Sequence, residues 1–276
     1  MVLELLVNPK KVTGKPWEMF FIGFVYSFIA AFLALWIFKN YVSIVMITIT
    51  IIASIPVVRN VINQEEEKDI KIKQEKKLLK EHSKAIMVLL YLFLGFTASF
   101  TMLYLFMPGV IVEKMFSAQL ETMITVQNPT GSFISSLGIV SRIFLNNIKI
   151  LLFCMIFSFF YGAGAIFILT WNASVMATAI GVFIRNNLFH AKGLFDYFQI
   201  TTVGLLKYTL HGIPEIAAYF IAALAGSIIS FALMKHDFMD KNFKKVLKDI
   251  VILTGAALFI LLLSALMEVF ITPIIL

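Results

Sequence analysis

The chain has 276 residues, of which 60% are hydrophobic and only 14% are charged, and its mean hydropathy is +0.93. Soluble globular proteins are about 45–50% apolar, and one soluble core of this size cannot bury such an excess, so the composition excludes an ordinary soluble domain. The net charge of +7 does not indicate nucleic-acid binding, because basic loops beside a membrane give the same excess. Proteins that bind phosphates and bases usually rely on arginine, which this sequence has only at Arg59, Arg142 and Arg185.

The charged residues are concentrated at 59–84 and 235–249, with long apolar tracts between them. A transmembrane helix needs about 20 apolar residues, so this block pattern predicts an all-α, polytopic transmembrane helical bundle of about seven spans, or six if the short fifth one does not cross. The predicted spans are Trp17–Phe38, Tyr41–Val58, Ala85–Met107, Phe144–Thr170, Asn172–Ile184, Ile213–Met234 and Ile250–Phe270. We expect residues 1–276 to form a single integral membrane domain.

Two segments in the first half differ from the spans. Residues 59–84 mix lysine with glutamate at helical spacing, including the favourable pair Glu67–Lys71, and predict a charged cytoplasmic helix or an extension of the next span. Residues 110–127 place apolar side chains on one helical face, which predicts an amphipathic helix in the membrane interface.

The second half contains the shortest span and a polar segment. We expect a turn at Trp171-Asn172, between the fourth and fifth spans. Residues 194–212 are too broken in hydropathy to span, and we interpret them as a re-entrant or interfacial segment before the sixth span.

Lysine and arginine determine the expected orientation, because they remain on the cytoplasmic side. With the N-terminus cytoplasmic and the C-terminus outside the plasma membrane, both charged blocks stay inside. The residues left outside are Lys39, Lys114, Arg142, Arg185 and Lys192.

Ionisable residues inside spans are candidates for function because a membrane makes them costly. Glu215 opens the sixth span, Glu268 lies near the end of the seventh, and His211 lies one turn before Glu215. Because these spans are antiparallel, we expect the three side chains at similar depth. Three interpretations of these side chains remain open. The first is a satisfied polar contact, the second is a cation or proton site, and the last is acid–base catalysis.

Two amides join this set. Asn147 opens the fourth span and Asn172 lies at the next expected turn, where either can bridge helices and Asn172 can cap one. The sequence contains no phosphate-binding glycine loop, no zinc-protease or serine-hydrolase motif, and one cysteine, Cys154. We therefore expect no enzyme activity, no cofactor and no firm metal site.

Four segments together resemble the stage II sporulation protein M family, in its archaeal-type form. They are Asn8-Pro9-Lys10-Lys11-Val12 with Pro16-Trp17-Glu18, Phe144-Leu145-Asn146-Asn147, His211-Gly212-Ile213-Pro214-Glu215, and Glu268 with Pro273. The resemblance covers most of the chain, and 140–276 most clearly.

This resemblance implies a polytopic membrane fold that keeps His211, Glu215, Asn147 and Glu268 as polar positions. The sporulation member is similar to a membrane scaffold that recruits peptidoglycan-remodelling partners and has no established catalysis, although fold alone does not transfer partners. We therefore expect a scaffold or assembly factor for membrane or envelope complexes, in contact with the lipid bilayer. It would bind proteins through 59–84 and form homo-oligomers. The alternative is an ion or proton transporter or channel that uses the Glu/His cluster.

Overall fold

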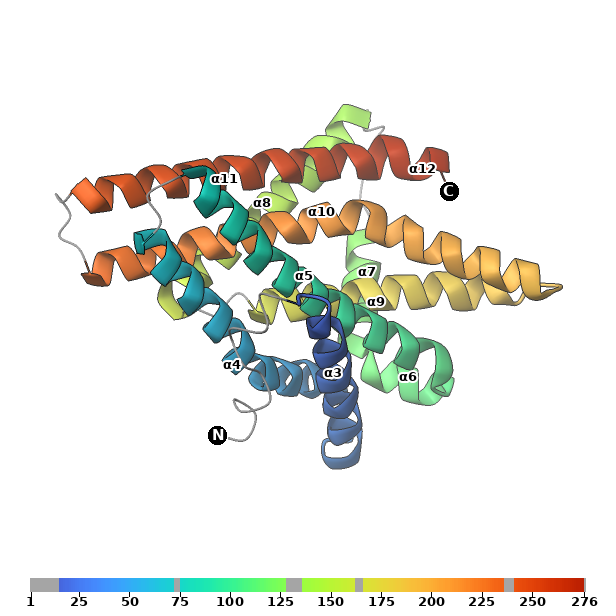
Figure 1. Cartoon of the computed structure of the whole chain (residues 1–276). Coiled ribbons are helices and arrows are strands. Elements are labelled where there is room, and N and C mark those ends of the chain that lie inside the picture. The colour runs from blue at the N-terminus through green and yellow to red at the C-terminus, as the bar shows by residue number, and fades with distance from the viewer. Residues whose placement is uncertain (1–14, 72–74, 128–135, 162–165, 236–240, 276) are drawn as a thin grey trace.

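The computed structural model describes residues 15–71, 75–127, 136–161, 166–235 and 241–275, and throughout these ranges the regular secondary structure is helical (Figure 1). The elements are α3 (Glu18–Ile37), α4 (Val42–Lys71), α5 (Glu75–Phe106), α6 (Gly109–Met115), α7 (Ser117–Gln127), α8 (Ser136–Tyr161), α9 (Ile166–Leu188), α10 (Leu194–Lys235), α11 (Lys241–Leu266), the π-helical turn η2 (Met267–Ile271) and α12 (Thr272–Ile275).

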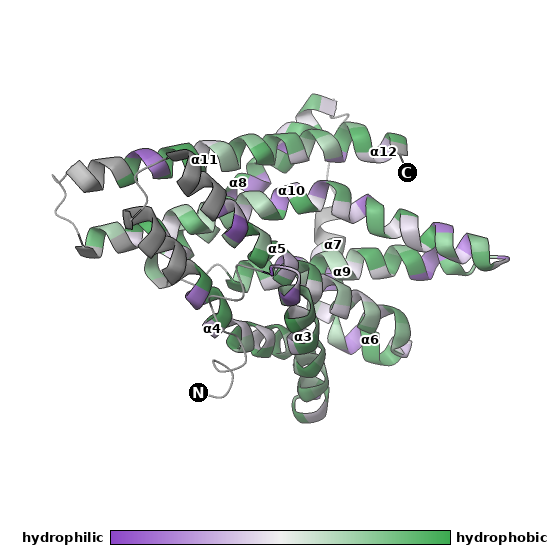
Figure 2. Ribbon diagram, in the orientation of Figure 1, coloured by the Kyte–Doolittle hydropathy of each residue, from purple (hydrophilic) through white to green (hydrophobic). Residues whose placement is uncertain are grey.

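Within the described ranges, seven helical segments are long and apolar enough to cross a membrane. They are Glu18–Ile37, Val42–Val61, His82–Phe106, Ser136–Phe160, Ile166–Leu188, Leu194–Ser230 and Val246–Ile274. Hydrophobic residues cover most of the length of α3 and α11 (Figure 2). The predicted fold class, a helical membrane bundle of about seven spans, is confirmed.

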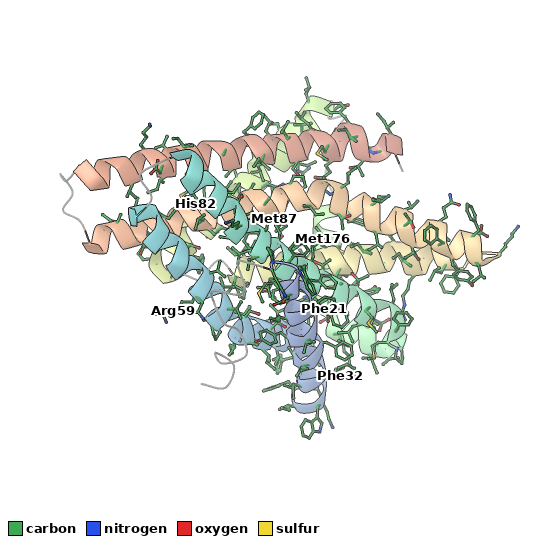
Figure 3. The ribbon with its side chains drawn as sticks, in the orientation of Figure 1. Phe21, Phe32, Arg59, His82, Met87 and Met176 are labelled. Atoms are coloured by element: carbon green, nitrogen blue, oxygen red, sulfur yellow. The ribbon has the colours of Figure 1, made fainter. Side chains whose placement is uncertain are left out.

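Large apolar side chains on the outside of the bundle are suited to lipid. Phe21 and Phe32 lie along α3 (Figure 3) and are 57% and 40% exposed, and Trp36 near the end of the same helix is 77% exposed. In water such a surface would be unfavourable, but in a bilayer these side chains meet acyl chains. The helix therefore packs through its small residues and presents its large ones to the membrane.

Small residues let the helices of the bundle approach closely, as the sequence predicts for Ala222-Ala223 and Ala225-Gly226-Ser227. A Cβ at Gly226 would collide with the backbone of Met155 in α8, and Ala222 and Ala225 are fully buried. In membranes this kind of contact contributes much of the helix association energy, since there is no hydrophobic driving force between helices. The sequence predicts the same kind of packing for Gly162-Ala163-Gly164-Ala165, which lies outside the described residues.

The expected turn at Trp171-Asn172 is wrong. Both residues lie inside α9, and the preceding helix α8 ends at Tyr161. The helix continues through Trp171-Asn172 because a single asparagine inside an apolar helix can bond to the preceding turn, as Asn172 does to the Ile168 carbonyl.

The expectation that 194–212 forms a separate re-entrant segment is also wrong. These residues are the first half of α10, a continuous helix of 42 residues, and Pro214 lies inside it. The ribbon bends near the middle of α10 without reversing (Figure 1), as expected where proline removes one backbone hydrogen bond.

The polar side chains of this half are accommodated by α9. The Lys207 ammonium lies 4.9 Å from the centre of the Phe183 ring, and Gly212 packs against the Met176 side chain (Figure 3 labels Met176). The segment 194–212 is helical although its hydropathy is low, because α9 supplies partners for its polar side chains. The sequence pattern alone does not show these partners, and for this reason the prediction was wrong.

Residues 110–127 form two short helices, α6 and α7, rather than one. Val112 and Phe116 of the predicted apolar face are buried. The charged segment 59–84 is helical at both ends, since α4 continues to Lys71 and α5 begins at Glu75.

Candidate functional site

The structure brings together four of the five residues that the sequence singles out. His211 and Glu215 lie on α10, Asn147 lies on α8 and Glu268 lies on η2. The Asn147 side chain hydrogen bonds to the Glu215 carboxyl group, and Glu268 is near enough to interact with Glu215 electrostatically. We call these four residues, with Tyr219 and Thr272, the polar cluster.

Tyr219 is a member that sequence reasoning missed. It lies one helical turn after Glu215, its side chain is fully buried, and its hydroxyl donates a hydrogen bond of 2.8 Å to Glu215 Oε1. Positions i and i+4 share a helix face, so the spacing of Glu215 and Tyr219 could have indicated this pair. Glu215 thus has one partner on its own helix and one, Asn147, on α8.

Thr272 joins α12 to the polar cluster. Its Oγ1 lies 3.4 Å from His211 Nδ1 and donates to the Met267 carbonyl at 3.1 Å. Since the hydroxyl donates to Met267, its oxygen can accept a hydrogen bond from His211 in the tautomer that carries the proton on Nδ1. His211 is half-buried, and this contact orients its imidazole toward the end of the last helix.

Glu268 occupies the π-helical turn η2, which separates α11 from α12. Such turns insert one residue into a helix and recur at functional sites. Pro273 lies two residues after the end of η2 and cannot donate a backbone hydrogen bond. Because η2 contacts α8 and α10, it carries Glu268 toward the helices that hold Asn147 and Glu215.

A second contact from α11 supports α10 beside its proline. Pro214 has no N–H for the Leu210 carbonyl, so the backbone hydrogen bonding of α10 is weakened at this turn. The Ser264 hydroxyl donates 2.7 Å to the neighbouring His211 carbonyl. The bend of α10 is therefore held by α11, next to the polar cluster.

Asn172 lies apart from this arrangement. Its amide donates 2.8 Å to the Ile168 carbonyl one turn earlier in α9. This bond satisfies an amide inside an apolar helix. Among the described residues its recorded partner therefore belongs to its own helix, and we do not include it in the polar cluster.

Another buried polar chain connects three helices elsewhere in the bundle. Ser43 of α4 donates 2.8 Å to Gln119 Oε1, and Gln119 Nε2 donates 3.1 Å to Ser174 Oγ of α9. Gln119, near the start of α7, is fully buried. This chain fixes α7 between α4 and α9.

The chemistry available to the polar cluster is limited. Across the described ranges, no group of three or more histidine, cysteine, aspartate or glutamate side chains is arranged to hold a metal ion. The Glu215 carboxyl group accepts a hydrogen bond at Oε1 from the Tyr219 hydroxyl, and it is hydrogen bonded to the Asn147 side chain. Because Asn147 lies on α8 and Glu215 on α10, the second bond holds these two helices together. The arrangement is suited to joining helices or to holding a proton.

The chain was compared with known proteins. The sequence model of a family described as Stage II sporulation protein M matches residues 98–273, which is more than half of the 276 residues. No curated protein and no solved structure matches the chain. The matched region contains every member of the polar cluster, from Asn147 to Thr272.

Proposed function

Because the chain belongs to the stage II sporulation protein M family, we propose that it is a non-catalytic membrane scaffold. In this role the bundle presents 59–84, which we call the charged segment, to a partner protein at the cytoplasmic face of the plasma membrane. The N-terminus is then cytoplasmic and the C-terminus external, because this orientation keeps the lysine-rich blocks inside.

The observation that carries the proposal is the continuation of helix beyond the apolar spans. The apolar run of the second span closes at Arg59 while α4 continues to Lys71, and α5 begins at Glu75 while the apolar run of the third span begins only at Ala85. Ten residues of helix extend about 15 Å, which is enough to carry the charged segment beyond the lipid headgroups. A helix that projects from a membrane and carries both signs of charge is suited to binding a protein of complementary charge.

The polar cluster supports this role as a brace. Asn147, Glu215 and Tyr219 join α8 to α10 through hydrogen bonds among themselves. A rigid bundle is what a scaffold needs to hold a docking element in one position. We therefore infer that these polar residues stabilise the bundle rather than transport an ion.

Site-specific photo-crosslinking in intact cells tests the docking role. A photoreactive amino acid replaces Glu66 or Ile70 in the extension of α4, and the matched control replaces Lys15, which is exposed just before α3 on the same, cytoplasmic side. We expect one dominant protein adduct from both extension positions and not from Lys15. Reversing the charges of Glu65, Glu66 and Glu67 to lysine should abolish the adduct formed at Ile70.

Two results would contradict the scaffold. One is an identical set of adducts from the extension and from Lys15, which would indicate random encounters. The other is an adduct at Ile70 that survives charge reversal, because charge complementarity would then have no part in binding.

A further inference from the structure

Helix α8 carries a polar stripe on its outer surface. Arg142, Asn146 and Lys149 are all exposed, and their spacing of four and three residues places them on one helical face. Asn147, next in sequence to Asn146, is 6% exposed and faces α10 instead. The stripe therefore points away from the bundle.

The same surface is otherwise apolar. Leu145 is 55% exposed beside the stripe, and Leu152, Phe153 and Ile156 are 48%, 55% and 49% exposed in the following turns. Side chains of this kind face acyl chains in a helix that crosses a bilayer. The stripe thus lies at the N-terminal end of a lipid-facing surface.

Lys149 lies on the lipid-facing surface of α8 and not in a loop. Leu145 and Leu152, one turn to either side of it, are 55% and 48% exposed. Lysines near the ends of transmembrane helices extend their ammonium group to the interface. The charge of Lys149 at the interface therefore needs an anionic partner nearby.

The described part of the chain does not supply this partner. No hydrogen bond or ion pair joins Arg142, Asn146 or Lys149 to another described residue, and the sequence of α8 contains no aspartate or glutamate. A symmetric contact between the α8 helices of two copies would place these cations against each other, since a two-fold interface pairs a surface with itself.

We propose that Arg142, Asn146 and Lys149 bind the phosphate of an anionic phospholipid. About 10 Å of helix separates Arg142 from Lys149, so the two long side chains converge from both ends of the stripe on one headgroup. The Asn146 amide donates a hydrogen bond between them, and the acyl chains lie along Leu152 and Phe153. This site is independent of the scaffold role and of the charged segment.

Bound lipid would also support the polar cluster. Asn146 and Asn147 are adjacent in sequence, the first exposed and the second buried, so a headgroup that holds Asn146 fixes the part of the helix from which Asn147 contacts Glu215. The site therefore couples the lipid-facing surface of α8 to its packing against α10.

Native mass spectrometry of the detergent-solubilised full chain tests the site, with phosphatidylglycerol and phosphatidylcholine as probes. Arg142→Gln/Lys149→Gln should weaken phosphatidylglycerol binding at least tenfold and leave phosphatidylcholine binding unchanged. The matched control is Lys39→Gln/Lys192→Gln, which removes the same charge from two exposed positions elsewhere and should bind like wild type.

The proposal is overturned if both double variants lose the lipid equally, if neither does, or if soluble glycerol phosphate displaces the lipid at equal concentration. Loss of an oligomer without loss of lipid also overturns it, in favour of a protein partner. If the double variant does not fold, a photoactivatable phosphatidylglycerol is crosslinked to the wild-type chain instead. Crosslinks in α8 between 142 and 156 support the site, and crosslinks confined to other helices contradict it.

Discussion

Replacing Tyr219 by phenylalanine isolates one hydrogen bond of the polar cluster. The ring of Tyr219 is fully buried and its hydroxyl donates 2.8 Å to Glu215. Phenylalanine keeps the packing of the ring and removes only the donor, so no large cavity forms. The change therefore measures the contribution of the bond to the stability of the bundle.

The expected cost follows from the surroundings. Net hydrogen bonds contribute about 0.5–1.5 kcal/mol in proteins, and those inside membrane bundles average about 0.6 kcal/mol. Glu215 keeps its contact with Asn147 after the change. We therefore expect Tyr219→Phe to lower the free energy of unfolding by about 1 kcal/mol. The double variant Tyr219→Phe/Asn147→Leu should lose more stability than the sum of the two single variants, because the Glu215 carboxyl group then has neither partner.

Reversible unfolding in mixed detergent micelles, followed by circular dichroism, measures these differences. Tyr197→Phe is the matched control, since that tyrosine is 47% exposed near the start of α10 and should change stability by less than about 0.5 kcal/mol. Equal stability of Tyr219→Phe and wild type, or additive costs in the double variant, would refute the view that the polar cluster braces α8 against α10.

Three further changes test the packing of the bundle by the same unfolding assay. Gln119→Ala should lower the free energy of unfolding by about 2–4 kcal/mol, because it breaks the contacts to α4 and α9 and leaves a buried gap. A decrease below about 0.5 kcal/mol would show that α7 is not fixed there. Gly226→Ala should lower the free energy of unfolding by about 1–3 kcal/mol, since the added Cβ would meet the backbone of α8. The matched control, Gly255→Ala, has open space for its Cβ and should not destabilise the bundle. Equal stability of the two variants would refute the close approach of α10 to α8. Ser264→Ala should cost about 1 kcal/mol by removing the donor to the His211 carbonyl beside the proline of α10, and an unchanged stability would mean that α11 does not hold the bend.

The spans could be predicted from the sequence because hydropathy is a local property. Runs such as Ala85–Met107 are apolar whatever they contact, and the structure confirms a helix there. The predictions were wrong where a tertiary contact stabilises a helix that the local hydropathy does not indicate. Lys207 lowers the hydropathy of 194–212 but lies over the Phe183 ring, so the helix continues where the sequence indicated a break.

The polar cluster was predictable in part for the same reason. His211, Glu215, Glu268 and Asn147 stand out as polar residues in apolar surroundings, and antiparallel spans bring the first three to similar depth. Tyr219 and Thr272 were missed because tyrosine and threonine are common in membrane helices and their role depends on which group lies opposite. The π-helical turn at Glu268 has no sequence signal beyond Pro273.

The scaffold role is tested most directly by replacing 62–80 with a short glycine–serine linker and measuring both the fold and the partner in the same preparation. The account predicts an unfolding transition like that of wild type, because the spans and the polar cluster are untouched, together with loss of the protein that crosslinks at Glu66. Retention of that protein by the shortened chain would contradict the account. Proton or cation flux in proteoliposomes that disappears in Glu215→Gln would contradict it as well, because the polar cluster would then be a transport site and not a brace.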